Sequence, residues 1–159
     1  MKANYGTVAK GVTREKLFEW FTDFSPEDVD IMKRGGIGGI LSREITRDGN
    51  KIHLEQMIQV MGMRRPMSID IVLHPEDYTY DAHLLSSMVE SDLRYTFTQL
   101  PDGTRISVDG NYRLTSRALK ILSILMLGLF KRGAARSFKR ELRAYIAEAE
   151  EQLNSKESK

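Results

Sequence analysis

The chain has 159 residues, of which 41% are hydrophobic and 29% are charged, and its formal net charge is +2. This length and composition predict one soluble domain over residues 1–153, with a frayed tail at 154–159. The small net charge gives no reason to expect a nucleic acid partner, and the lack of cysteine excludes disulfides, thiolate metal sites and a cysteine nucleophile. The first residues contain no apolar run typical of a secretory signal, so we expect a cytoplasmic protein.

The first part of the chain predicts a strand followed by two short helices. Residues 3–12 form the expected strand, and Thr13 is a suitable N-cap for the first helix. Ser25 and Pro26 begin the second helix, because serine caps helices and proline is tolerated in their first turn. The glycines of RGGIGG, residues 34–39, end it. The apolar stripe of the first helix is Leu17, Phe18, Phe21 and Phe24.

From residue 39 to residue 114, apolar and polar residues alternate. This pattern is typical of an antiparallel sheet with one face in water. The clearest turn signals between strands are Asp48-Gly49-Asn50 and Pro101-Asp102-Gly103. We expect the charged residues of the wet face to form cross-strand ion pairs rather than an acid–base pair for catalysis. The expected strands are residues 39–47, 51–61, 66–74, 77–84, 89–97 and 104–114.

The remainder of the chain, residues 117–153, returns to helical spacing, and we expect one long helix that bends at Gly128 or Gly133. Its first part, ALKILSILMLGLFKRG at residues 118–133, is the most apolar stretch of the chain. It is too short to span a bilayer, and its apolar residues occupy more than one helical face. We expect it to border the mouth of an internal cavity. A homodimer contact and a peripheral membrane contact remain the alternatives, because basic residues follow it.

The order of these elements predicts an α+β fold in which about seven antiparallel strands form one curved sheet. Such a sheet has one apolar face, and only the C-terminal helix is long enough to cover it. The small inward residues Ala82, Ser91 and Gly110 leave room between the two layers. We therefore expect an apolar cavity between the sheet and the C-terminal helix.

Three segments of the chain resemble the START-like, or SRPBCC, helix-grip superfamily, which includes polyketide cyclase/dehydrase-like proteins and pollen-allergen-like ligand binders. They are VTREKLFEWFTDFSPEDV, the glycine-rich entry to the second strand, and LFKRGAARSFKRELRAYIAEAEEQL. The first matches the apolar-aromatic helix of the family, with Trp20 and Asp23 at its end, and the last matches its basic-then-apolar closing helix. The resemblance covers nearly the whole chain. It implies a curved sheet wrapped around a long C-terminal helix, with a cavity for a hydrophobic ligand between them. The resemblance does not specify which ligand is bound or whether a reaction takes place.

The candidate ligand-binding residues are the inward residues of the strands and of the C-terminal helix. Their polar members are tyrosines, a serine and a glutamine, which need hydrogen-bond partners if they are buried. These partners are either other core groups, or a ligand and water, and both interpretations remain open. The full set is Gln56, Ile58, Ile69, Ile71, Tyr80, Ser91, Leu93, Tyr95, Phe97, Val108, Tyr112, Leu122, Met126, Phe138 and Leu142.

The other motifs favour structural interpretations. GGIGG lacks the third glycine of a dinucleotide-binding loop, and the spacing of His53, His74 and His83 matches no zinc site. No metal motif is visible, and we expect no cofactor and no metal. No nucleophile–base pair is visible either, so an enzyme ranks below a binding protein. The predicted function is binding of a hydrophobic small molecule or lipid, for sequestration or transport. The alternatives are a polyketide cyclase/dehydratase-like enzyme that uses pocket tyrosines, and an interaction module that uses the basic C-terminal helix.

Overall fold

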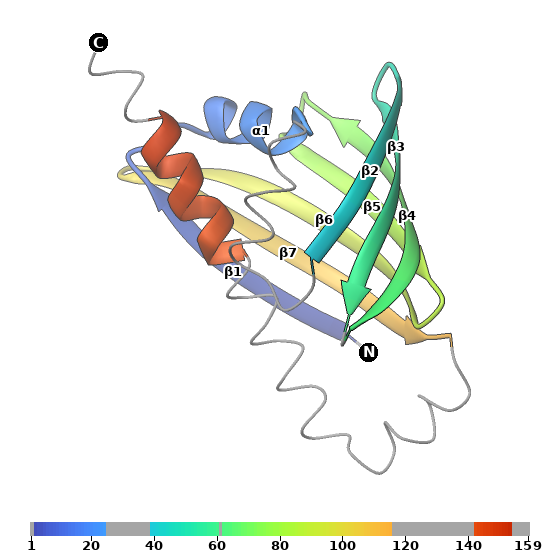
Figure 1. Ribbon diagram of the computed structural model, residues 1–159. Coiled ribbons are helices and arrows are strands. Elements are labelled where there is room, and N and C mark those ends of the chain that lie inside the picture. Colours follow the sequence, from blue (N-terminus) through green and yellow to red (C-terminus); the bar gives the residue numbers. More distant parts are fainter. Residues whose placement is uncertain (1, 25–38, 61, 116–141, 154–159) are drawn as a thin grey trace.

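The computed structural model of the chain describes residues 2–24, 39–60, 62–115 and 142–153. Its strands are β1 (Lys2–Lys10), β2 (Gly39–Asp48), β3 (Lys51–Val60), β4 (Met63–His74), β5 (Thr79–Ser86), β6 (Val89–Leu100) and β7 (Gly103–Leu114). All pair antiparallel in one seven-stranded sheet of order β1-β7-β6-β5-β4-β3-β2. The helix α1 (Arg14–Thr22) follows β1, and residues 142–153 form a helix near the C-terminus (Figure 1).

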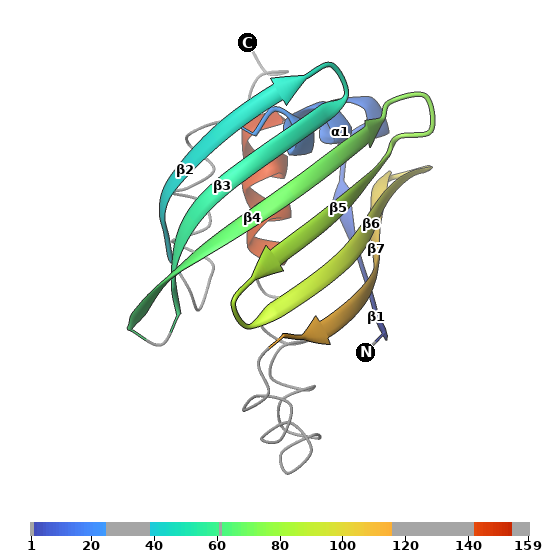
Figure 2. The same cartoon turned by 90° about the vertical axis from the view of Figure 1, so that its right-hand side faces the viewer.

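The sheet curves around these two helices, which lie on the same side of it. Figure 2 shows the outer face of the sheet toward the viewer, with α1 and the helix at 142–153 behind it. We call the helix side the concave face and the other side the outer face. The expected α+β fold with a curved antiparallel sheet and a C-terminal helix is therefore confirmed. The second short helix expected from Ser25, residues 117–141 of the expected long helix and the tail at 154–159 lie outside the described residues.

The first helix begins as the sequence predicts but ends earlier. The Oγ1 atom of Thr13 accepts a long hydrogen bond from the backbone nitrogen of Lys16 (3.5 Å). The helix ends at Thr22, so Phe24 does not belong to its stripe, and Phe24 instead adopts a left-handed φ of 48°. Its ring still packs partly buried against the core. Arg47 of β2 explains this end, because its Nη2 atom donates to the carbonyl oxygen of Thr22 (2.9 Å).

Several strand boundaries differ from the expected ones for local reasons. β1 ends at Lys10 rather than residue 12, because Gly11 takes a φ of 70° and donates its N–H to the turn before β7. β4 begins at Met63 rather than residue 66, because Met63 already pairs with Val60 of β3. β5 begins at Thr79 rather than residue 77, because the preceding residues form a turn. The hairpin predicted at Asp48-Gly49-Asn50 is confirmed.

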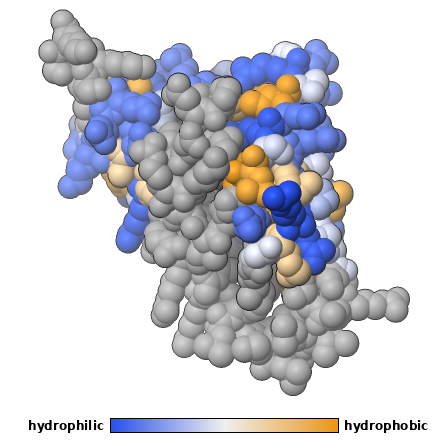
Figure 3. Space-filling view, viewed as in Figure 1, coloured by the Kyte–Doolittle hydropathy of each residue, from blue (hydrophilic) through white to orange (hydrophobic). Residues whose placement is uncertain are grey.

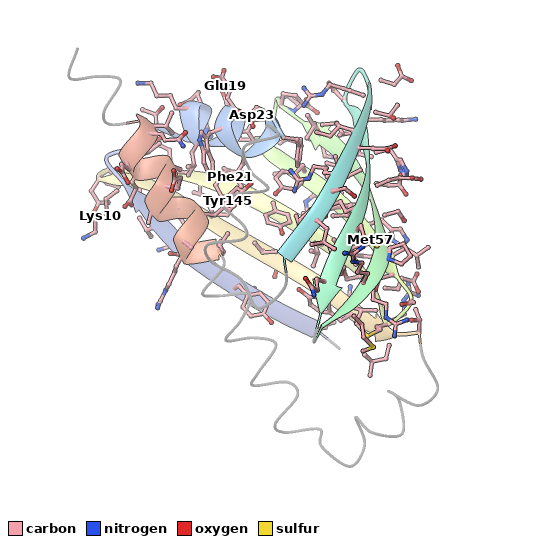
Figure 4. The ribbon with its side chains drawn as sticks, in the orientation of Figure 1. Lys10, Glu19, Phe21, Asp23, Met57 and Tyr145 are labelled. Atoms are coloured by element: carbon pink, nitrogen blue, oxygen red, sulfur yellow. The ribbon has the colours of Figure 1, made fainter. Side chains whose placement is uncertain are left out.

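The core lies between the concave face and the two helices, and its most densely packed part is aromatic. The ring of Phe97 on β6 meets the rings of Phe18 and Phe21 on α1 edge-on, with centroids 5.5 and 5.4 Å apart. Figure 4 shows Phe21 beside Tyr145, between α1 and the helix at 142–153, with ring centroids 5.4 Å apart. Trp20 joins the same helices by donating from Nε1 to Oε1 of Gln152 (3.2 Å). These contacts close the end of the fold next to α1.

Candidate functional site

Inward side chains of neighbouring strands lie in rows across the concave face, because directly paired residues in an antiparallel sheet point to the same side. The alternation expected from the sequence is confirmed for β4, β5, β6 and β7. Three successive rows, starting nearest α1, are Leu73-Tyr80-Tyr95-Val108, then Ile52-Ile71-Ala82-Leu93-Gly110, then Ile45-Leu54-Ile69-Leu84-Ser91-Tyr112.

Burial along the concave face differs between its two ends. In the first two rows the side chains other than Tyr95 are buried, with Val108 at 0% and Ile71 at 3% exposure. In the third row Leu54 and Ser91 are still buried, but Ile69 and Leu84 are only half-buried, and Ile45 of β2 is 38% exposed. The concave face therefore has a closed end next to α1 and a more accessible end beyond it. We call the second the accessible end.

The predicted candidate residues divide into a buried group and a half-buried group. The candidate residues on the strands all lie on the concave face. Whether any of them contacts a ligand stays a prediction. Apart from Gln56 and Ser91, which lie toward the accessible end, the buried candidates belong to the packed core. The buried ones are Gln56, Ile71, Tyr80, Ser91, Leu93, Phe97, Val108 and, on the C-terminal helix, Leu142. The half-buried ones are Ile58, Ile69, Tyr95 and Tyr112. Leu122, Met126 and Phe138 lie outside the described residues.

A bulge in β2 brings residues to the concave face that the sequence analysis missed. Ile40 pairs with Ile58, but Ser42 pairs with Met57, so the register shifts at this point. Arg43, Ile45 and Arg47 consequently face inward. The sequence did contain a signal, because Ile40 and Ile45 are separated by five positions. Two apolar residues an odd number apart can share a face only if the strand contains an extra residue.

Three tyrosines contribute polar groups to the concave face. Tyr80 and Tyr95 are stacked, with ring centroids 4.3 Å apart and planes 13° apart. Burial, and then the neighbouring Tyr95, raise the pKa of Tyr80 well above its usual 10. Burial also raises the pKa of Tyr112 to about 12. Both hydroxyls therefore stay protonated at neutral pH, so they are suited to donate hydrogen bonds and not to act as bases.

The outer face is charged, as the sequence predicts, and its side chains pair across strands. His53, His74 and His83 each lie against an aspartate of a neighbouring strand, at 2.7, 3.2 and 2.7 Å. Arg113 also pairs with Glu90 (2.9 Å). A hollow of about 780 Å³ that is open to solvent lies on this face and is lined mainly by such polar groups. It is on the opposite side of the sheet from the expected apolar cavity and is a different feature.

Two further properties concern only the part of the chain that the structure describes. No group of three or more histidine, aspartate or glutamate side chains there is arranged to hold a metal ion. None of the helices described has both the length and the apolar character needed to cross a membrane.

We expect the imidazole of His53 to titrate above its usual pKa of about 6.5. Hydrogen bonds to Asp70 and then Glu55 raise the pKa of His53, because they favour the charged ring. Because the pKa is raised in the folded state, the stabilising contribution of the His53–Asp70 pair is complete below about pH 6.5. That contribution is lost as the pH rises through the folded pKa of His53. NMR titration of His53 checks this, and Asp70→Asn should lower the value. The control is Asp102→Asn, which changes a carboxylate in a distant turn and should leave the pKa of His53 unchanged. A pKa of His53 at or below about 6.5 in the wild type would contradict the expectation.

The comparisons with known proteins identify the fold. No family model matches the chain, and no curated protein matches it in sequence. Solved structures do match. The protein TTHA0849 from Thermus thermophilus superposes with a TM-score of 0.73 at 14% identity, over 94% of this chain and 97% of that one. The Zhui aromatase/cyclase from Streptomyces sp. R1128 gives 0.72 at 13% identity, over 96% and 95%.

This chain has a helix-grip fold. The resemblance to the START-like superfamily expected from the sequence is thus confirmed at the level of the fold. Norcoclaurine synthase from Thalictrum flavum, solved in complex with dopamine and hydroxybenzaldehyde, shares the fold with a TM-score of 0.64 at 11% identity, over 98% of this chain and 87% of that one. At such identities the likeness concerns the backbone, and a helix-grip fold alone specifies neither ligand nor reaction.

Proposed function

We propose that this helix-grip protein binds a hydrophobic small molecule or lipid on the concave face of its sheet. The observation that carries the proposal is the incomplete burial of apolar side chains at the accessible end. Ile69 and Leu84 point inward from central strands, yet they are only half-buried. In a filled core such side chains would be closed off from solvent. A mostly apolar concave surface with few polar groups is typical of a small-molecule site.

Two further features support this proposal. Apolar surface also appears at β2, where Leu41 and Ile45 are 41% and 38% exposed, and Figure 3 shows apolar patches among hydrophilic side chains in the region of this strand. The neutral hydroxyl of Tyr112 lies in the same row as Leu84 and Ile69 and can orient a ligand by donating a hydrogen bond. The proposed homodimer and membrane contacts involve residues 118–133 and stay predictions.

A cyclase- or dehydratase-like enzyme is the second candidate. One observation favours it, because neutral tyrosines can donate a proton or hydrogen bond to a carbonyl oxygen of a substrate. Such chemistry also needs a base. Among the described strands, however, no histidine or carboxylate occupies an inward position, and all three histidines lie on the outer face. We therefore place the binding function first.

We expect Leu84→Trp to weaken binding of the neutral apolar dye Nile red by at least about tenfold, a change of about 1.4 kcal/mol. The larger side chain would occupy the space that the ligand needs. Fluorescence titration measures the affinity, and thermal unfolding checks that the variant is folded. Leu85→Trp is the matched control, because Leu85 is the next residue on β5 but faces outward with 47% exposure.

This experiment distinguishes a ligand space on the concave face from an interior that is filled by side chains. A ligand space predicts that Leu84→Trp stays folded and loses the dye, while Leu85→Trp behaves as the wild type does. A filled interior predicts that Leu84→Trp destabilises the fold by about 1 to 3 kcal/mol through overpacking, with no dye bound by any variant. The second result would refute the proposed function.

A further inference from the structure

Two arginines interrupt the apolar concave face at its accessible end. Arg43 of β2 pairs with Gln56 of β3, and Arg65 of β4 pairs with Ile58 of β3. Directly paired residues share a face, and Gln56 is only 5% exposed on the concave side. Both guanidinium groups therefore project on the concave side, one from each neighbour of β3.

The first of these groups is held in place by a buried amide. With the Gln56 amide turned so that its donors and acceptor are both satisfied, its oxygen accepts from Nε (2.9 Å) and Nη2 (3.2 Å) of Arg43. Arg43 is half-buried. The hydrogen bonds to Gln56 therefore hold a charged guanidinium group next to the mostly apolar side chains of the concave face. A guanidinium fixed in this way is matched to the two oxygens of a carboxylate.

The second group contains a buried donor without an acceptor. The Nε atom of Arg65 is buried, and no described residue accepts its hydrogen bond. The Nη2 atom of Arg65 lies 3.5 Å from the sulfur of Met63, which is a weak acceptor. The described strands direct no aspartate or glutamate to the concave side, so their concave face offers Arg65 no carboxylate. A buried, unpaired N–H of a charged group is unfavourable and indicates that its acceptor comes from outside the described strands.

We propose that Arg43, Gln56 and Arg65 form the polar end of the ligand site and bind the carboxylate of a long apolar acid. The inference rests on the proposed function and adds the chemical class of the ligand. The apolar body of the acid lies along Ile69 and Leu84, toward the stacked tyrosines. From Met67, opposite Gln56, to Ile71, in the buried second row, β4 advances four residues, or about 13 Å at about 3.3 Å per residue. This length accommodates an extended alkyl chain.

The test compares two ligands that differ only in their head group. Dodecanoate and 1-dodecanol are titrated against Nile red bound to the full chain, after bound lipid has been removed. We expect the wild type to prefer dodecanoate by at least about tenfold, because only the carboxylate can accept from both guanidinium groups. Arg65→Gln and Arg43→Gln should each weaken dodecanoate by at least about fivefold and leave 1-dodecanol within about twofold.

The control is Arg64→Gln, which removes the same charge from an exposed residue of β4 that points to the outer face. It should leave both affinities unchanged. Equal binding of the two ligands by the wild type, or equal losses in the Arg64 and Arg65 variants, would overturn the carboxylate site while leaving the proposed function intact. Failure of the folded wild type to bind either ligand or the dye would refute the proposed function itself. Thermal unfolding confirms that each variant is folded. If Arg43→Gln does not fold, the comparison of Arg65→Gln with Arg64→Gln is sufficient to test the proposal.

Discussion

Replacing Phe97 by alanine is expected to lower the free energy of unfolding by about 3 to 5 kcal/mol. The ring is 2% exposed and sits at the centre of the aromatic cluster, in contact with Phe18, Phe21 and Tyr80. Removing it leaves a cavity that the surrounding rings cannot fill, in addition to the loss of buried apolar surface. Urea unfolding followed by circular dichroism measures the change.

The size of this loss also tests how the concave face is divided. Phe97→Leu should cost clearly less, because leucine retains most of the apolar volume. A loss below about 1.5 kcal/mol for Phe97→Ala would mean that the end next to α1 is not closed. The ligand site would then extend further toward α1 than we propose, past the row of Ile71 and Ala82 and as far as the stacked tyrosines.

Introducing aspartate at Ile106 is expected to have a still larger effect, above about 4 kcal/mol at neutral pH. Ile106 is 0% exposed and is paired with Phe97 across the sheet. A carboxylate at this position would be charged, buried and without a cation, so it would either remain unfavourable or take up a proton. Arg105→Asp, at the neighbouring exposed position of β7, should cost far less.

The pH dependence of this variant has a defined sign. Burial would raise the pKa of the introduced carboxyl in the folded state above its unfolded value of about 3.9. The destabilisation relative to wild type should therefore be smallest below about pH 4 and should grow as the pH rises through the folded pKa. Urea unfolding of both proteins at acid and neutral pH measures it. A difference that does not change with pH would contradict a buried carboxyl.

The physical division of the concave face relates the fold to the proposed function. The closed end holds α1 and the helix at 142–153 against the sheet and so provides stability. The accessible end retains apolar side chains that are not fully buried, together with the neutral hydroxyl of Tyr112 and the arginines Arg43 and Arg65. A site with few, well-placed polar groups on an apolar wall orients an amphipathic ligand without requiring a catalytic base. This combination is why we propose binding rather than catalysis.

Much of this architecture was determined by the sequence alone. The alternation in β4 to β7 placed Ile69, Tyr80 and Leu93 on one face, because successive side chains of a strand point to opposite sides. Thr13 marked the start of α1, and Gly49 marked the hairpin between β2 and β3, because caps and tight turns require particular residue types. These are local rules. For that reason the curved antiparallel sheet and its wet outer face could be predicted.

Other features were decided only by the tertiary structure. The inward position of Arg43 depends on the bulge in β2, and that of Arg65 on the extra length of β4, neither of which strict alternation specifies. The difference in burial between Val108 and Ile69 depends on which helix covers which row of the sheet. Periodicity assigns a residue to a face, whereas burial, pKa and the pairing of charges depend on contacts between segments far apart in the chain.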